Sequence, residues 1–299
     1  PARNAFVPDL VDEQLIFTAM ALNTAGMNFA RILAPAFAGF LIAWIAAGDT
    51  TSAFGVGVVY MVIGGLYFLS AVTMLLVSKS GRAGSRATRK HPFIEILDGL
   101  NYVRAHPAIL ALILLSIVPF MFGMPLNTLL PAFNEDVLLG GPDDLGLLLS
   151  AMGMGAILGS LMLAASGDLK HKGTWLVVSC FGWGVATVLF GMAPNLWTAV
   201  AVLALVGWLS SWNMSLNRGL LQVQVERRMR GRIMSIDMMS HGLMPLGVLP
   251  VSMIADAYDI STSLIVSGVV FIILISVMVL VSTPVRKLDS MMLDGHRAN

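Results

Sequence analysis

Residues 263–283 read SLIVSGVVFIILISVMVLVST, an apolar run without a single Asp, Glu, Lys or Arg. An α-helix needs about 20 mostly apolar residues to cross the hydrocarbon core of a bilayer, so this run predicts a membrane-spanning helix. Seven further apolar runs lie at 18–46, 54–78, 107–132, 145–166, 174–192, 196–217 and 233–254. Because the runs are too long and too apolar for the alternating strands of a membrane barrel, we predict an all-α integral membrane protein with eight spans.

The composition indicates that the lipid bilayer is part of the solvent of this chain. Hydrophobic residues make up 57% of it and charged residues only 12%, whereas about 25% charged residues is usual in soluble domains. A soluble fold of this length could not keep so much apolar surface away from water. The net charge of +1 gives no sign of nucleic-acid binding. The single cysteine, Cys180, excludes a disulfide within the chain.

The Lys and Arg residues predict which side of the membrane each connection faces. Of the 18 such residues, we place Arg31 alone inside a span. The others fall in alternate connections, which are the first segment, loop 79–106, the loops after the fourth and sixth spans, and the tail. The intervening loops 47–53, 133–144, 193–195 and 255–262 contain neither Lys nor Arg. Under the positive-inside rule, both termini and loop 79–106 are cytoplasmic.

Loop 79–106 is the longest and most basic connection, with two predicted spans before it and six after it. We expect four parts along the chain. Residues 1–78 hold the last two spans of an N-terminal six-helix half, 79–106 form a central cytoplasmic loop, 107–285 form a C-terminal six-helix half, and 286–299 form a cytoplasmic tail.

An internal similarity supports this division. ARILAPAFAG (30–39) places Arg31 four residues before a proline, and SHGLMPLGVL (240–249) places His241 likewise. The two segments lie in the first and seventh predicted spans, which suggests parallel six-span repeats, one of the recurring plans of transporters.

These features together resemble the major facilitator superfamily, whose members have two six-helix halves. The opening PARNAFVPDLV (1–11) is similar to the connection between spans four and five in the branch that includes the enterobactin exporter and macrolide efflux pumps. RGRIMS (230–235) is similar to that branch's connection between spans ten and eleven. The resemblance covers the whole chain and implies that the eight spans are spans five to twelve, with the first four absent. It also implies a bacterial inner membrane protein that is monomeric when full length and has no cofactor.

Two motifs of the superfamily occur here with substitutions. GDLKHKG (167–173) resembles a loop motif in which Asp168 and Lys172 are in register while Lys170 and Gly173 are displaced. In such a loop, a carboxylate near a helix N-terminus makes and breaks contacts with its surroundings as the two halves rock. APAFAG (34–39) resembles the span-five motif of antiporters. The expected conformational residues are therefore Pro35, Gly39, Asp168, Lys170, Lys172, Gly173, Arg230, Gly231 and Arg232.

Polar side chains inside the spans are the candidates for the transport pathway and for proton coupling. Arg31 shares one helical face with Asn28 and Thr24, and a guanidinium in hydrocarbon normally faces a partner or a wet cavity. Asp237 and His241 lie one turn apart, and histidine titrates near neutral pH, so this pair can carry a proton. Asn127, Asn213 and Asn217 complete the candidate set, and no metal site is expected. The structural alternatives are an Arg31 paired with backbone carbonyls or a carboxylate, and an Asp237 that only starts a helix beside a hydrogen-bonded His241.

Two patterns favour helix packing over function. Gly155 and Gly159 form a GxxxG pattern inside a span, which is typical of close helix contacts. Trp208 and Trp212 form a stripe that can stack on a substrate, although packing in the membrane is its commoner use.

The leading hypothesis is a secondary active exporter of an amphipathic siderophore-like or drug-like molecule, which works by alternating access and exchanges protons. No G-x-x-x-x-G-K-[ST] run points to ATP hydrolysis. An intramembrane enzyme is disfavoured, because the Tyr258–Asp259 pair falls in a loop and no H-E-x-x-H or G-x-S-x-G motif occurs. We therefore expect neither catalytic residues nor an enzyme. A non-transporting protein, such as a lipid scramblase or a scaffold, is the open alternative.

Overall fold

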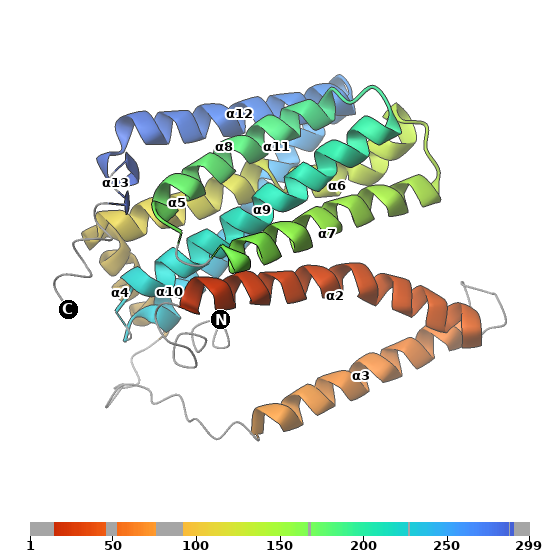
Figure 1. Ribbon diagram of the computed structural model, residues 1–299, viewed down its shortest axis with the longest axis horizontal. Coiled ribbons are helices and arrows are strands. Elements are labelled where there is room, and N and C mark those ends of the chain that lie inside the picture. The colour runs from red at the N-terminus through yellow and green to blue at the C-terminus, as the bar shows by residue number, and fades with distance from the viewer. Residues whose placement is uncertain are drawn as a thin grey trace.

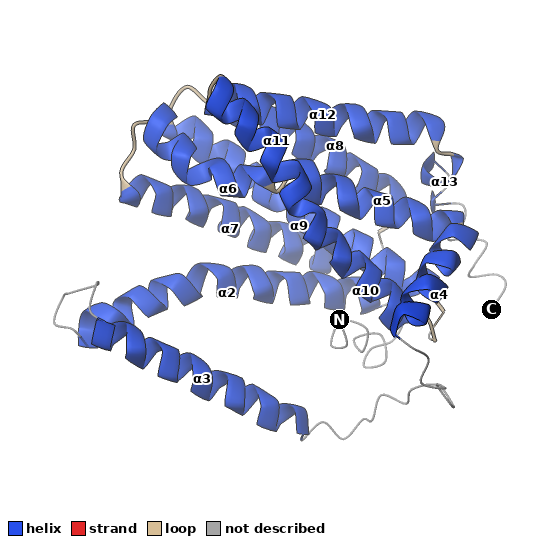
Figure 2. Ribbon diagram, turned by 180° about the vertical axis from the view of Figure 1, so that it is seen from behind, coloured by secondary structure: helices blue, strands red, loops and turns tan. Residues whose placement is uncertain are grey.

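The computed structural model describes residues 15–45, 53–75, 92–166, 169–226, 228–286 and 288–289. In these ranges the chain is built of helices and short connections, without a β-strand (Figure 2). The α-helices are α2 (Ile16–Ile45), α3 (Ala53–Leu75), α4 (Pro92–Ala105), α5 (Pro107–Phe122), α6 (Pro125–Ala132), α7 (Pro142–Ala165), α8 (Lys172–Gly191), α9 (Leu196–Gln224), α10 (Arg230–Ser240), α11 (Met244–Ala257), α12 (Ile260–Val281) and α13 (Thr283–Arg286).

The predicted all-α membrane fold is confirmed. Seven stretches of the described residues are helical, long and apolar enough to cross a membrane, and each coincides with a predicted span. They are Ala53–Thr73, Pro107–Val137, Asp143–Ala165, Lys172–Gly191, Leu196–Gln224, Arg230–Ala257 and Ile260–Val281. Residues 18–45 of the remaining predicted span, 18–46, lie in α2, a helix of 30 residues. At about 1.5 Å per residue, a helix of that length exceeds the thickness of the hydrocarbon core.

Two of the predicted spans consist of two helices in line. α5 ends at Phe122, and the N–H of Gly123 donates to the carbonyl oxygen of Pro119 at 2.8 Å. α6 then follows and continues into a π-helical turn, Phe133–Val137. Likewise α10 passes through a 3₁₀ turn, His241–Leu243, into α11, which has a proline in its first turn. Proline lacks a backbone donor and is tolerated in the first turn of a helix, so it favours such a break.

The helices α5 to α12 lie side by side as a bundle, and α2 packs along α7 and α9 (Figure 1). α3 contacts α2 at one end and then diverges from it. Large apolar side chains of α3 face outward, among them Tyr60, Met61 and Phe68. A helix that exposes such side chains on nearly every face is suited to a lipid or protein environment rather than to water.

The predicted GxxxG packing is confirmed at the α7–α9 interface. A Cβ atom added to Gly155 would collide with the carbonyl group of Ala204, and one added to Gly159 would lie 2.6 Å from Cδ1 of Trp208. The two helices approach this closely because the glycines carry no side chain.

Loop 79–106 was predicted as one cytoplasmic connection, and part of it is helical. Residues 79–91 lie outside the described residues, whereas 92–105 form α4. Val103 of α4 is buried, and Gly99 faces Ile236 of α10, so the helix packs through one apolar side. The prediction missed this helix because its apolar residues are too few for a span.

Candidate functional site

Two predicted pathway residues on α9 are deeply buried. Asn213 and Asn217 are each 3% exposed. Nδ2 of Asn213 donates to Sγ of Cys180 on α8 at 2.8 Å. Oδ1 of Asn217 is buried, and within the described part of the chain it has no hydrogen-bond partner. Asn127 lies in α6, apart from this pair. Its Nδ2 atom donates to Met124, at 3.4 Å to the carbonyl oxygen and 3.5 Å to Sδ.

Asp237 lies in α10 and is 2% exposed. Its Oδ1 atom is buried without a hydrogen-bond partner among the described residues. The hydroxyl of Ser240 donates to the backbone carbonyl of Asp237 and lies 3.4 Å from the hydroxyl of Ser116 on α5. The side chain of His241 is outside the described residues, and its backbone begins the 3₁₀ turn. The predicted Asp237–His241 pair therefore stays a prediction.

The predicted polar face of α2 begins at Thr24, and this residue contacts α9. Oγ1 of Thr24 donates to the carbonyl oxygen of Met20 at 2.9 Å and accepts a hydrogen bond from the hydroxyl of Ser215 at 3.0 Å. Asn28, Arg31, Pro35 and Gly39 follow along the same helix, but their side chains are outside the described residues. Their predicted roles are therefore untested.

One buried basic residue was placed wrongly from the sequence. Arg218 was predicted in the connection after the sixth span, but α9 continues to Gln224 and holds Arg218 six residues before its end. The residue is 8% exposed. The helix continues because Ser215 and Gln222 on either side of Arg218 pack against α2, through Thr24 and Met20. Arg31 is thus not the only basic residue within a span. The overlooked signal was the buried helical pattern of Leu216, Leu220 and Leu221 around this arginine.

The loop motif before α8 is only partly covered by the described residues. Asp168 lies outside them, and Lys170 is exposed. Nζ of Lys172 lies 4.1 Å from the centre of the Phe17 ring on α2, a cation–π contact between the first span and α8. The conformational role predicted for Lys172 stays a prediction.

A carboxylate does cap the N-terminus of α8, and it comes from the C-terminal segment. Oδ1 of Asp289 accepts from the backbone N–H of Gly173 at 2.7 Å, and Oδ2 accepts from Thr174. Gly173 is buried, and a Cβ atom there would lie 2.6 Å from Cβ of Leu288. Glycine is therefore needed at 173 for the close approach of this segment. Sequence reasoning missed Asp289, because nothing local connects it with α8.

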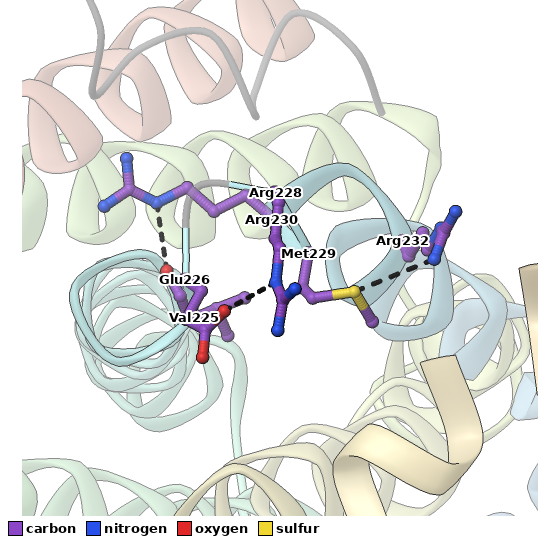
Figure 3. Close-up of polar contacts among 6 residues, drawn as sticks. All are labelled: Val225, Glu226, Arg228, Met229, Arg230 and Arg232. Carbon is purple, nitrogen blue, oxygen red and sulfur yellow. Dashed lines mark hydrogen bonds and ion pairs between the residues drawn. The ribbon is translucent and has the colours of Figure 1, made fainter. Parts of the chain in front are cut away.

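The RGRIMS segment has a specific set of polar contacts where α9 passes into α10 (Figure 3). Nε of Arg230 donates to the carbonyl oxygen of Val225 at 3.2 Å, just after the last turn of α9. A cation is favourable at the negative end of a helix dipole. A guanidinium nitrogen of Arg232 lies 3.7 Å from a carboxylate oxygen of Asp98, which connects α10 with α4. Gly231 is exposed.

Of the two tryptophans in the stripe, Trp208 and Trp212, the second packs between helices. Nε1 of Trp212 donates to the carbonyl oxygen of Gly159 at 2.7 Å, so this side chain fixes α9 against α7. Trp208 lines a groove of about 570 Å³ between the same helices, together with Met154, Leu158 and other mainly apolar side chains. Within the described ranges, no group of three or more His, Cys, Asp or Glu residues is placed to hold a metal ion.

Comparison with known proteins identifies relatives of three kinds. The Staphyloferrin A transporter of Staphylococcus aureus is 28% identical over 273 residues, which cover 90% of this chain and 65% of the relative. Macrolide efflux protein A of Streptococcus pyogenes is 24% identical over 295 residues, or 97% of this chain and 70% of the relative. The Enterobactin exporter EntS of Shigella boydii is 28% identical over 233 residues, which cover 77% of this chain and 52% of the relative.

The chain thus spans between about half and 70% of the length of these relatives. The family model described as transmembrane secretion effector matches residues 1–298, nearly the whole chain. With its multiple membrane-spanning helices, the chain belongs to this family within the major facilitator superfamily.

Proposed function

We propose that this chain forms the greater part of a secondary active exporter of an amphipathic small molecule, siderophore-like or drug-like, in the inner membrane of a bacterium. The proposal is carried by the family match over residues 1–298, with relatives named as a transporter, an efflux protein and an exporter. Transporters of this plan rock two helical halves about a site near the middle of the membrane. No enzymatic chemistry is part of the proposal.

In this proposal α2 and α3 are spans five and six, and α5 to α12 supply the C-terminal six-span half. The boundaries are those expected from the sequence, at 78, 106 and 285. Both termini of the chain and α4 are cytoplasmic. Basic residues at the starts of α8 and α10, such as Lys172 and Arg230, support this orientation, since positive charges are retained on the cytoplasmic side.

The transport pathway is proposed to run along the buried polar residues of α9 and α10. Asn213, Asn217 and Asp237 lie within helices that span the membrane, where buried polar groups usually serve function. Asp237 is the proposed proton carrier. Its buried Oδ1 atom has no hydrogen-bond partner among the described residues, which supports this role, because ionisable groups within membrane spans usually serve function. Asn28, Arg31, Asn127 and His241 are proposed as further members of the pathway.

The contacts at the cytoplasmic end are proposed to rearrange as the halves rock. They are the Lys172–Phe17 contact, the cap of Asp289 on Gly173, and the Arg232–Asp98 contact. Contacts of this kind, between separate segments at the end of a bundle, can break and re-form at small cost.

The test is the steady-state accumulation of fluorescent amphiphiles in bacterial cells that express the complete gene product. We expect cells with the protein to accumulate less of at least one compound from a broad panel than cells with an empty vector. Equal accumulation of every compound, with the protein present in the membrane fraction, would remove the exporter proposal. Movement of labelled lipids between leaflets without export would instead favour a scramblase.

A further inference from the structure

Arg218 is a buried cation whose charge is not balanced by its described surroundings. The residue is 8% exposed and lies within α9. Among the residues that the structure describes, no carboxylate lies within 4.0 Å of its guanidinium, and the group makes no hydrogen bond. A guanidinium keeps its charge in proteins and carries five N–H donors. Burying it without an acceptor is costly, so a buried arginine in a span normally faces a partner or a cavity.

The position of Arg218 on α9 is fixed by its neighbours one turn away. Ser215, three residues before it, donates to Thr24 of α2 at 3.0 Å. Gln222, four residues after it, contacts Met20 of α2 at 3.5 Å and Met234 of α10 at 3.9 Å through its Nε2 atom. Residues three and four apart share one helical face. Arg218 therefore lies where α2, α9 and α10 meet.

Unmatched acceptors lie on the same helices. Oδ1 of Asn217, the residue next to Arg218, has no hydrogen-bond partner within the described residues, and neither does Oδ1 of Asp237. Asp237 is one turn along α10 from Met234, which touches Gln222. Arg218 and Asp237 are thus two buried, opposite charges on neighbouring helices that do not pair with each other.

Two less buried arginines at the same end of the molecule behave differently. Arg228 is 76% exposed in its side chain, and its Nε donates to Glu226 at 2.7 Å. Arg232 lies 3.7 Å from Asp98. Arg228, which is exposed, and Arg232, which is half-buried, both have carboxylate neighbours, whereas the buried Arg218 has none in the described ranges. This contrast argues against Arg218 as a mere marker of topology.

We propose that Arg218 is the anion-recognition residue of the transport site and that it binds the carboxylate or phosphate group of an amphipathic molecule. The inference rests on the proposed transport function and adds a substrate class to it. The planar guanidinium forms two parallel hydrogen bonds with such a group. The free oxygens of Asn217 and Asp237 accept hydrogen bonds from donors of the same molecule. The anion is either the head of a free amphiphile or the headgroup of a lipid.

The test uses the full chain in nanodiscs of phosphatidylcholine and a matched pair of probes, dansylaminoundecanoic acid and its methyl ester. Energy transfer from tryptophan to the dansyl group reports binding, and the signal of empty nanodiscs is subtracted. We expect the acid to bind about tenfold more tightly than the ester, since a hydrogen bond to a charged group is worth about that factor. Arg218→Gln removes the preference, and Arg218→Lys retains part of it. Arg228→Gln, which removes an exposed charge, leaves the preference unchanged.

Equal binding of acid and ester by the wild type would overturn the proposal. So would an unchanged preference in Arg218→Gln, provided that its thermal unfolding in detergent shows a folded protein. If Arg218→Gln does not fold, Arg218→Lys takes its place. A preference for the acid as strong in Arg218→Lys as in Arg228→Gln would then overturn the proposal.

Nanodiscs with added phosphatidylglycerol distinguish the sources of the anion. If the anionic lipid abolishes binding of the acid to the wild type, the site belongs to a lipid headgroup. If the wild type still binds the acid in these nanodiscs, the site belongs to a free anion.

Binding is measured without any gradient, so the two proposals fail separately. An acid preference that depends on Arg218, in a protein that exports nothing, would leave the anion site standing and remove the transport function.

Discussion

The carboxylate of Asp289 accepts a hydrogen bond from the backbone N–H of Gly173 at 2.7 Å, although 116 residues separate the two along the chain. Its other oxygen accepts from the N–H of Thr174 at 3.1 Å and from the Thr174 hydroxyl at 2.6 Å. The free N–H groups and the positive end of the dipole make a helix N-terminus a favourable place for a carboxylate. The C-terminal segment thus caps α8 at the end that also presents Lys172 to α2.

Replacement of this cap by Asp289→Ala should destabilise the folded chain. Loss of a capping side chain costs about 1 kcal/mol of the free energy of unfolding. We expect a lower midpoint of thermal unfolding in detergent, followed by circular dichroism. Asp136→Ala serves as the control, because Asp136 is exposed in the connection between α6 and α7. A midpoint equal to that of the wild type would show that the cap contributes nothing to stability.

The close approach at Gly173 gives an independent prediction. Gly173→Ala introduces a Cβ atom 2.6 Å from Cβ of Leu288, so one of the two segments has to move. Overpacking of this kind costs roughly 1–3 kcal/mol. The matched control is Gly146→Ala in α7, where no atom lies within 4 Å of the added Cβ and the helix should gain about 0.5–1 kcal/mol. The two variants should move the unfolding midpoint in opposite directions, and equal shifts would contradict the observed packing.

Asp259 predicts a dependence of stability on pH. The side-chain hydroxyl and the backbone N–H of Thr262 both donate to its carboxylate, at 2.6 Å and 2.8 Å, at the start of α12. These hydrogen bonds lower the pKa of Asp259 in the folded chain. Its stabilisation is therefore complete above the ordinary pKa of about 3.9 and is lost as the pH falls through the lowered value.

Asp259→Asn keeps a good capping residue and removes this titration. The difference in unfolding midpoint between the wild type and Asp259→Asn should shrink as the pH is lowered from about 6 to about 3. A difference that stays constant over this range would mean that the pKa of Asp259 is the same in the folded and the unfolded chain.

The proposed proton carrier is tested by Asp237→Asn in the complete gene product. An amide of the same shape cannot bind and release a proton near neutral pH, so uptake driven by a pH gradient should fall at least about tenfold. Flux down a substrate gradient should persist, because the pathway itself is intact. Asp256→Asn, which changes an exposed carboxylate at the end of α11, is the control. Gradient-driven uptake at the wild-type rate by Asp237→Asn would remove this residue from the coupling mechanism.

The spans could be predicted from the sequence because the bilayer imposes a length and a composition on every one of them. The apolar run 263–283 and its helix, Ile260–Val281, agree within a few residues. Close helix packing at Gly155 and Gly159 could also be anticipated, although not its partner α9, since small residues four apart allow such contacts. These features depend on local sequence and on lipid, both of which are visible without a structure.

The candidate site was less predictable, because it depends on contacts between distant segments. The sequence predicts Arg218 in a connection, since a basic residue near the end of an apolar run usually lies outside the membrane. The packing of Ser215 and Gln222 on α2 extends α9 past this arginine. No motif connects Asp289 with Gly173. The sequence of α4 predicted a loop, because the apolar side of this helix packs on α10, a contact between distant segments.

The most direct test of the transport account is uptake into everted inner-membrane vesicles that contain the complete gene product. A fluorescent amphiphile is supplied outside, and its accumulation is followed with a pH gradient and after the gradient is collapsed by nigericin. We expect accumulation that depends on both the protein and the gradient. Accumulation that is the same with and without the protein, for every compound of a broad panel, would contradict it.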